Sequence, residues 1–455
     1  MSQRTVIFLC GFVLLLATGT AASESLDFDQ VLERALNTDN RIKEREHYVT
    51  AARARKDEAS GSDDLLISLN SFVGLTTQVD GGLYGEDNVG CSGSGCVSRG
   101  DNRDINGITP WFNLQLSLIK PLYTFGKIEN YERAAEGNIA LKQGDVAIQR
   151  GQTMLDVSKA YYGYLAARDT RKLMLDASKR LQSASYLVET WLEEESGDVK
   201  QSDLHALKAG QALAQSYFAK ASALEKVAMA GLKTLTQWPD ADSLTLLERR
   251  IRPLPKPVLL LSELQQQALE RRPEMGQVEA GLQVRRALVE AKKSEGKPNI
   301  YAGIIAGAAY SPGRDQLNNP HIYDPFNYEA VTPVLGLQWA FSYGAQPARE
   351  ARAQAELDAT LSLAAFARQG IPFQVAESYH QVQGHFDMVV SLEQAAREAR
   401  RWMVSSYADF EAGLEKADKV VTALQAYVLA YGQYLQAVYE YNMYVKKLSV
   451  VSGGN

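Results

Sequence analysis

Two cysteines are the residues whose spacing most plainly predicts chemistry, the formation of a disulfide. Cys91 and Cys96 lie in a stretch rich in glycine and serine. In an oxidising compartment this spacing favours a small local disulfide. A metal or redox site is the alternative, but no histidine is nearby and the Cys-x-x-Cys spacing is absent. Closing so short a loop would stabilise the fold by at most about 2 kcal/mol.

No other set of residues has the spacing of a catalytic or cofactor-binding site. The five histidines are scattered, and the nearest two in sequence, His380 and His385, would not share one face of a helix. The sequence has no glycine-rich phosphate loop, no Gly-x-Ser-x-Gly motif and no His-Glu-x-x-His motif. We therefore predict a protein that is not an enzyme, with no catalytic residues, no cofactor and no metal.

The segment Met1–Ala22 has the features of a secretory signal peptide. Arg4 precedes an apolar run at Val6–Ala17, and the segment ends on the small residues Ala21 and Ala22. A transmembrane anchor is the alternative, but the run is shorter than the roughly 20 residues that cross a bilayer. We therefore expect an exported protein. Its formal net charge of −6 and the lack of a basic stripe argue against nucleic acid as a partner.

The mature sequence repeats itself at long period. Val157–Tyr161 (VSKAY) and Val375–Tyr379 (VAESY) begin 218 residues apart, each inside a long helical pattern. Farther on, Gly197 and Gly413 interrupt the two patterns at what we predict are the tips of helical hairpins. A repeat of this kind changes the expected fold, because both copies must build the same unit.

A proline-rich connector, residues 252–257, separates the two copies, since proline cannot continue a helix. We assign residues 23–251 to the first repeat and 258–455 to the second. Each repeat is predicted to contain a leading helix, two strands and a long helical hairpin. The predicted leading helices are 28–60 and 262–294, and the predicted strands are about 65–78, 110–123, 300–310 and 333–343.

The long helices have the periodicity that helix pairing requires. Ala177, Leu181, Ala184 and Val188 follow alternating steps of four and three residues, which is typical of a coiled-coil seam. Pro372 lies in the second long helix, where it removes a hydrogen bond. We expect a local kink or bulge there, with the helix continuing.

The predicted strands alternate between apolar and polar residues. Leu114 and Leu116 project from one face of their strand, and Asn113 and Gln115 project from the other. This pattern suits the wall of a membrane β-barrel, apolar toward lipid and polar toward a lumen. An antiparallel sheet half-buried in a soluble protein is the alternative. Because four strands cannot close a barrel and open edges cannot face lipid, a membrane barrel would have to be shared between chains.

Four motifs occur in order along the mature chain. They are Pro121–Lys127 (PLYTFGK), Val157–Tyr162 (VSKAYY), Gly197 followed by Ser202-Asp203-Leu204, and Lys297–Ile300 (KPNI). With them the chain resembles the TolC-type outer-membrane efflux proteins, or outer membrane factors, over nearly its whole mature length. The resemblance implies a mainly α fold with a small β portion. Long helical hairpins would form a periplasmic α-barrel, and each chain would add four strands to a shared transmembrane β-barrel.

The resemblance also implies a function, a localisation and a set of partners. The chain would be the outer-membrane channel of a tripartite export or efflux system, a passive homotrimeric duct that extends into the periplasm. Its partners would be outer-membrane lipid, a periplasmic adaptor (a membrane fusion protein) and an inner-membrane transporter. A periplasmic coiled-coil scaffold or adaptor that does not span the membrane is the alternative. The transported substrate, small molecules or a polypeptide, stays open.

The hairpin tips are where this sequence departs from the family pattern. In the resemblance, Asp203 matches an acidic pore position, but a second acidic position falls on Lys419, with Asp418 one residue early. Phe410 and Glu415 take the places of a tyrosine and an arginine in the polar network that closes the pore. We therefore predict an altered periplasmic constriction built from these five residues. The alternative is that the charges are solvated and gate nothing.

Overall fold

The computed structural model describes residues 25–80, 104–195, 199–239, 242–314 and 323–454. The predicted signal peptide, the Cys91–Cys96 pair and Gly197 lie outside these residues. The chain forms two compact units. Unit 1 comprises residues 1–40, 150–264 and 374–455, and unit 2 comprises residues 41–149 and 265–373. Each unit therefore contains parts of both sequence repeats.

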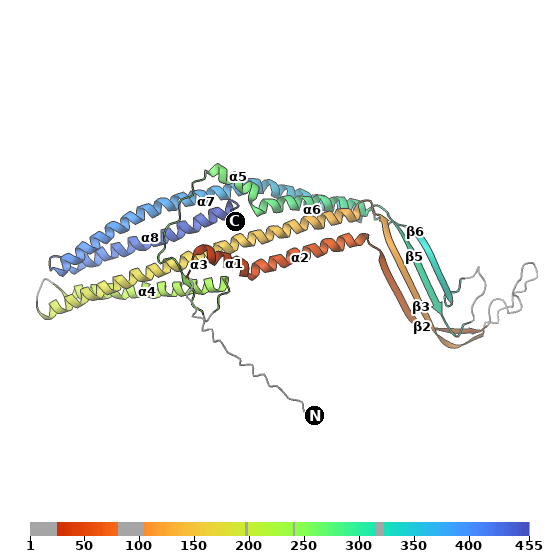
Figure 1. Cartoon of the computed structure of the whole chain (residues 1–455), viewed down its shortest axis with the longest axis horizontal. Helices are drawn as coiled ribbons and strands as arrows, with labels where there is room; N and C mark the ends of the chain where they lie inside the picture. The colour runs from red at the N-terminus through yellow and green to blue at the C-terminus, as the bar shows by residue number, and fades with distance from the viewer. Residues whose placement is uncertain (1–24, 81–103, 196–198, 240–241, 315–322, 455) are drawn as a thin grey trace, which may run out of the picture. The chain divides into compact units, whose positions relative to one another are not determined.

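Two long helical hairpins contain the longest helices of the fold (Figure 1). The first consists of α3 (Lys127–Glu193) and α4 (Gln201–Leu235), and the second of α7 (Ala345–Glu411) and α8 (Ala417–Val451). Both long helices have 67 residues and both short helices have 35. The prediction of two equivalent hairpins is confirmed, and α7 continues through Pro372.

The two leading helices are each divided, so the prediction of single helices at 28–60 and 262–294 is wrong. In the first repeat, α1 (Phe28–Thr38) and α2 (Asn40–Ser60) are separated by Asp39, whose backbone is extended. In the second repeat, α5 (Leu261–Arg271) and α6 (Pro273–Glu295) are separated by Arg272, which is also extended. Proline disfavours the helical conformation of the residue before it, so the break at Arg272 follows from Pro273.

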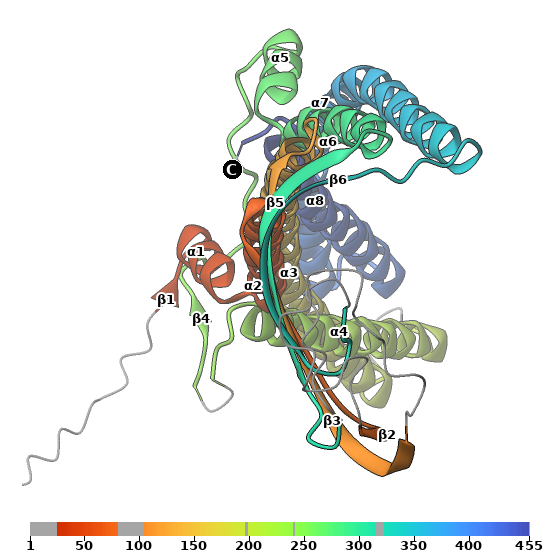
Figure 2. The ribbon, with the colours of Figure 1, turned by 90° about the vertical axis from the view of Figure 1, so that its right-hand side faces the viewer.

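The four long strands form one antiparallel sheet. They are β2 (Leu66–Asp80), β3 (Asp104–Tyr123), β5 (Asn299–Tyr310) and β6 (Tyr328–Gln338). The strand order is β2-β3-β5-β6, so the pairing of β3 with β5 joins the two repeats. The sheet is curved (Figure 2). Three short elements complete the fold, namely the 3₁₀ helix Gly61–Asp63 and the parallel pair β1 (Ser25–Leu26) and β4 (Thr245–Leu246).

Strand β6 lies five residues earlier than the predicted range of 333–343. Its pairing with β5 runs from Asn299 opposite Gln338 to Ala309 opposite Tyr328. Beyond Gln338, β5 has no further residue to pair with, because it begins at Asn299. The indole N–H of Trp339 instead donates to the carbonyl of Gly296 (3.0 Å), as the chain turns toward α7.

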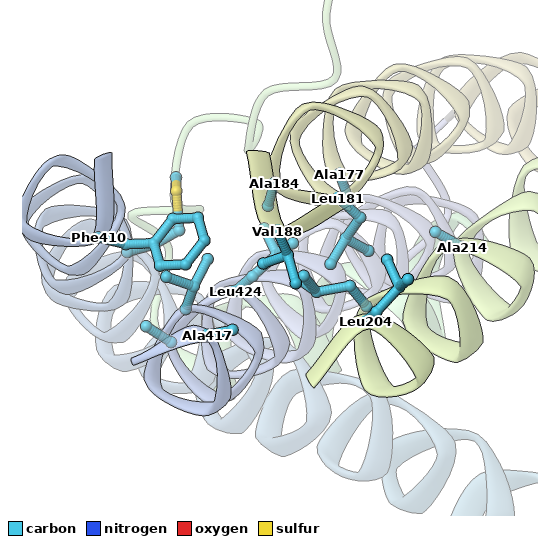
Figure 3. Close-up of a cluster of buried hydrophobic side chains, with 13 residues drawn as sticks. Ala177, Leu181, Ala184, Val188, Leu204, Ala214, Phe410, Ala417 and Leu424 are labelled. Carbon is cyan, nitrogen blue, oxygen red and sulfur yellow. The ribbon is translucent and has the colours of Figure 1, made fainter. Parts of the chain in front are cut away.

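The core of unit 1 lies between the two hairpins (Figure 3). The predicted seam of α3 is confirmed, since Ala177, Leu181, Ala184 and Val188 are all buried there. The other helices contribute Leu204, Leu207, Ala214, Met403, Phe410, Ala417, Val420, Ala423 and Leu424 to the same cluster. Small residues in this set let the helix backbones approach closely, so the hairpins pack tightly in the part that ends at their tips.

A buried asparagine holds the proline-rich connector against α8. The Asn442 side chain is fully buried, and its Nδ2 donates to the carbonyl of Arg252 (2.8 Å). Its Oδ1 accepts the backbone N–H of Leu254, also at 2.8 Å. One side chain thus satisfies both a donor and an acceptor of a segment whose prolines cannot form a helix or a sheet ladder.

Candidate functional site

The sheet has two chemically different faces, and its register extends each face across all four strands. One transverse row consists of Leu69, Leu116, Ala306 and Val331. The adjacent row, on the opposite face, consists of Asn70, Gln115, Gly307 and Ala330. The apolar side chains are open to solvent in the single chain: Leu69 is 62% exposed and Val331 is 74% exposed. Apolar surface on this scale indicates contact with lipid or with another chain.

A charged cluster lies where the strands meet the helices in unit 2. The Lys292 Nζ lies 2.7 Å from the Tyr131 hydroxyl and 2.7 Å from the Glu295 Oε1, and the Tyr131 hydroxyl donates to the same carboxylate. Nearby, the Ser294 hydroxyl donates to the carbonyl of Phe125 at the turn that starts α3 (2.9 Å). These contacts tie α6 to the first turns of α3.

The cluster shifts the pKa of all three of its members. Burial alone would raise the pKa of Glu295, but hydrogen bonds from Lys292 and Tyr131 hold it below its ordinary value. Burial would lower the pKa of Lys292, yet its bonds to Glu295 and Tyr131 raise it. The pKa of Tyr131 is raised by burial and by the neighbouring carboxylate. The lysine–carboxylate pair is therefore charged across the neutral range.

Replacing Glu295 with glutamine is expected to lower the free energy of unfolding by about 1 kcal/mol at neutral pH. A depressed carboxyl pKa stabilises the fold above the ordinary value of 4.5, and this contribution is lost as pH falls through the folded pKa. The difference between wild type and Glu295→Gln should therefore shrink below pH 4.5. Urea titrations of both proteins across the acid range measure it. A constant difference down to the acid limit would contradict the assignment.

The structure places one predicted constriction residue, Phe410, in the core. Its side chain is 1% exposed, and its ring meets the Trp191 ring edge-on at 5.2 Å. Phe410 therefore packs the hairpins and does not line a constriction, which corrects that part of the prediction. Trp191 was not among the predicted residues, because its contact with α7 is not visible in local sequence.

The remaining tip residues lie at the starts of the two short helices. The Asp203 carboxylate accepts the backbone N–H of Lys200 (2.9 Å), which orders the first turn of α4. Glu415 is half-buried, and its carboxylate accepts the N–H of the next residue (3.3 Å). Asp418 and Lys419 are exposed in the first turn of α8. Within the described residues, no ion pair joins any two of these four side chains.

Gly413 occupies the turn between α7 and α8, as predicted for a hairpin tip. Its φ of 72° lies in the left-handed region that glycine adopts without strain. The N–H of Gly413 donates to the Phe410 carbonyl, and the N–H of Leu414 donates to the Asp409 carbonyl (2.8 Å). These bonds close the end of α7 and reverse the chain.

Two further properties of the described residues concern metal binding and membrane-crossing helices. In the part of the chain that the structure describes, no three His, Cys, Asp or Glu side chains gather closely enough to hold a metal ion. None of the described helices combines the length and the apolar character of a membrane-crossing helix.

Comparison with solved structures identifies the fold as that of outer-membrane channels, which confirms the predicted TolC-type architecture. The channel OprN is 17% identical, with 94% of this chain and 90% of that one covered and a TM-score of 0.75. CmeC of Campylobacter jejuni is 13% identical, with coverage of 94% and 85% and a TM-score of 0.74. The open state of MtrE from Neisseria gonorrhoeae is 15% identical, with coverage of 94% and 89% and a TM-score of 0.71. No protein-family model and no curated protein sequence matches the chain.

Proposed function

We propose that this protein is a passive outer-membrane channel of a tripartite export or efflux system, with no catalytic role of its own. The observation that carries the proposal is the sheet, whose exposed apolar face is opposite a face of mostly polar and small residues. A lipid-facing barrel wall needs this division. The fold it shares with outer-membrane channels supports the same function. In the alternative, a periplasmic scaffold that does not span the membrane, no lipid would cover the apolar face.

The two free edges of the sheet support assembly into a homotrimer with a shared barrel. Strands β2 and β6 are the edges, and edges cannot be left open in lipid. Beyond Thr76, the backbone of β2 bonds to another segment, because the Val79 N–H donates to the Gly313 carbonyl (3.0 Å). The part of β2 from Leu66 to Thr76 equals β6 in length, 11 residues. Pairing these segments antiparallel places Leu66 opposite Gln338 and keeps apolar side chains on one face.

Cysteine cross-linking tests this register and the trimer together. In a Cys91→Ser, Cys96→Ser background, Leu69→Cys with Leu335→Cys should form disulfides between chains, because the proposed register makes these two residues neighbours. Leu69→Cys with Val334→Cys is the matched control, since Val334 projects from the opposite face. Covalent trimers in outer-membrane fractions are expected from the first pair alone. Recovery of soluble periplasmic monomers would support the scaffold alternative and exclude the channel.

We further propose that the periplasmic tips of the hairpins meet an adaptor and an inner-membrane transporter, and that Asp203, Glu415, Asp418 and Lys419 form a charged constriction there. The exposed first turns of α4 and α8 support this proposal, because charges in those positions are available to a pore or to a partner. Co-purification of an adaptor with the full-length chain, and its loss when both tips are altered, tests the partner assignment.

Replacing Lys419 with alanine is expected to change the single-channel conductance in a planar bilayer by a factor of about 1.5 or more. A ring of cations at a constriction repels permeating cations, so its removal should raise cation flux. Lys220→Ala, at an exposed position farther along α4, is the control and should leave conductance unchanged. Equal conductance in all three proteins would show that Lys419 does not line the constriction.

A further inference from the structure

The connection between β5 and β6 folds back across the sheet. Its two described ends, residues 311–314 and 323–327, are called the strap here. The strap follows β5, yet it bonds to the two strands on the far side of β5 in the strand order. The N–H of Gly313 donates to the Thr109 hydroxyl on β3 (3.0 Å), and the Gly313 carbonyl accepts the N–H of Val79 on β2 (3.0 Å).

An arginine clamp holds the strap in this position. The Arg314 Nη1 donates to the carbonyl (2.9 Å) and the hydroxyl (3.2 Å) of Thr77 on β2. The Arg314 guanidinium also lies 4.1 Å from the ring centre of Phe326, and that ring meets the Trp111 ring at 5.3 Å. The clamp therefore joins both ends of the strap to both strands of the first repeat.

Two further bonds close the strap on itself. The Asn327 Oδ1 accepts the N–H of Ser311 (2.9 Å), and its Nδ2 donates to the Arg314 carbonyl (3.2 Å). The Asp324 carboxylate accepts the N–H of Phe326 (3.0 Å), which orients the ring that covers Arg314. A segment with this many internal bonds has a defined position.

The strap lies on the polar face of the sheet. Alternation along β3 places Thr109 and Trp111 on the same face as Gln115, opposite Phe112 and Leu114. Thr109 is buried under Gly313, whose backbone lies directly against the threonine side chain. The strap also lies at the end of the sheet that is far from the helices, because β3 runs from this end to the start of α3.

We propose that the strap is a fixed constriction in the outer mouth of the assembled channel, and that Arg314 holds it there. This inference rests on the proposed function, in which the apolar face meets lipid, the polar face lines the lumen and the helices extend into the periplasm. Each chain of a trimer would place one strap inside the mouth. The constriction excludes large solutes from the lumen and admits small ones.

Thiol labelling of intact cells tests the constriction. Gln115→Cys, in the Cys91→Ser, Cys96→Ser background, places a thiol on the polar face below the strap. A small membrane-impermeant maleimide should label it from outside, whereas a maleimide joined to a long polyethylene glycol chain should react slowly. Adding Arg314→Ala should accelerate the large reagent about tenfold by releasing the strap, with the small reagent unchanged. Adding Phe326→Ala should do the same, because it removes the other side of the clamp.

Controls separate failure of the constriction from failure of the channel. Arg133→Ala, at an exposed position on α3, should leave both labelling rates unchanged. Heat-modifiable trimers are measured first, so that a variant that fails to assemble is recognised. If the large reagent reacts equally fast with and without the clamp, the constriction is overturned and the channel stands. If the small reagent reaches the thiol introduced by Gln115→Cys only after lysis, the channel itself is overturned, and the constriction with it.

Discussion

The Phe410→Ala variant is expected to lose about 3–5 kcal/mol of its free energy of unfolding, the usual cost of removing a buried phenylalanine. Phe410 is among the largest fully buried side chains, and its ring fills the space between Trp191 and the first turns of α8. The substitution removes apolar contact and leaves a cavity that stiff helices cannot collapse to fill. Denaturant unfolding followed by tryptophan fluorescence, with Trp191 as the local reporter, measures the loss.

Phe410→Leu is the matched control for this variant, because it keeps most of the apolar volume and should cost less than about 1.5 kcal/mol. A second comparison uses Phe410→Tyr, which adds a hydroxyl to a buried position. If Phe410→Ala and Phe410→Leu unfold at the same denaturant concentration as wild type, Phe410 does not pack the hairpins. If Phe410→Ala instead changes the conductance strongly and leaves the free energy of unfolding unchanged, Phe410 lines the constriction.

Gly303→Ala is expected to reduce the amount of trimer in the outer membrane about tenfold or more, because it overpacks the pairing of β3 with β5. A Cβ atom at Gly303 would lie 2.3 Å from the Leu118 carbonyl oxygen and 3.2 Å from the Ile119 Cα. Both are backbone atoms of the paired strand, so no side-chain rotation relieves the overlap. This pairing is also what joins the strands of one repeat to those of the other.

Gly344→Ala is the control for Gly303→Ala, since a Cβ atom there meets nothing within 4 Å. Heat-modifiable trimers in outer-membrane fractions are compared on gels with and without boiling. Normal trimer from Gly303→Ala would mean that the two strands part or slide at this point without loss of assembly. A loss of trimer from both glycine variants would point to the glycines' flexibility and away from the strand contact.

The hairpins and the faces of the sheet could be predicted because both follow from the spacing of apolar residues that are a few positions apart in the sequence. Ala177, Leu181, Ala184 and Val188 recur at the spacing of a coiled-coil seam, and all four are buried. Leu114 and Leu116 alternate with polar residues, and their shared face follows from the geometry of any strand. Pro273 also signals a break, since proline restricts the residue before it, although the prediction of a single helix at 262–294 missed this signal.

The break at Asp39 and the burial of Phe410 near the tip could not be predicted in this way. Asp39 interrupts the first leading helix without a proline, and its carboxylate accepts a hydrogen bond from Thr153, a residue of α3 (2.7 Å). Phe410 was assigned to the constriction because the resemblance places it at a tyrosine position of the polar network. Its burial depends on Trp191, which is on the other hairpin.

The sequence by itself determined the repeat, the helical hairpins and the two faces of each strand, because these depend on residues a few positions apart. The tertiary structure alone decided which predicted residues meet and where the chain folds back on itself. Arg314 and Thr77 are 237 residues apart in sequence, and Tyr131 and Lys292 are 161 apart. Contacts at such separations leave no periodic signal, since they are set by the register of strands and the packing of helices from different repeats. The strap and the charged cluster of Tyr131, Lys292 and Glu295 are therefore properties of the folded chain.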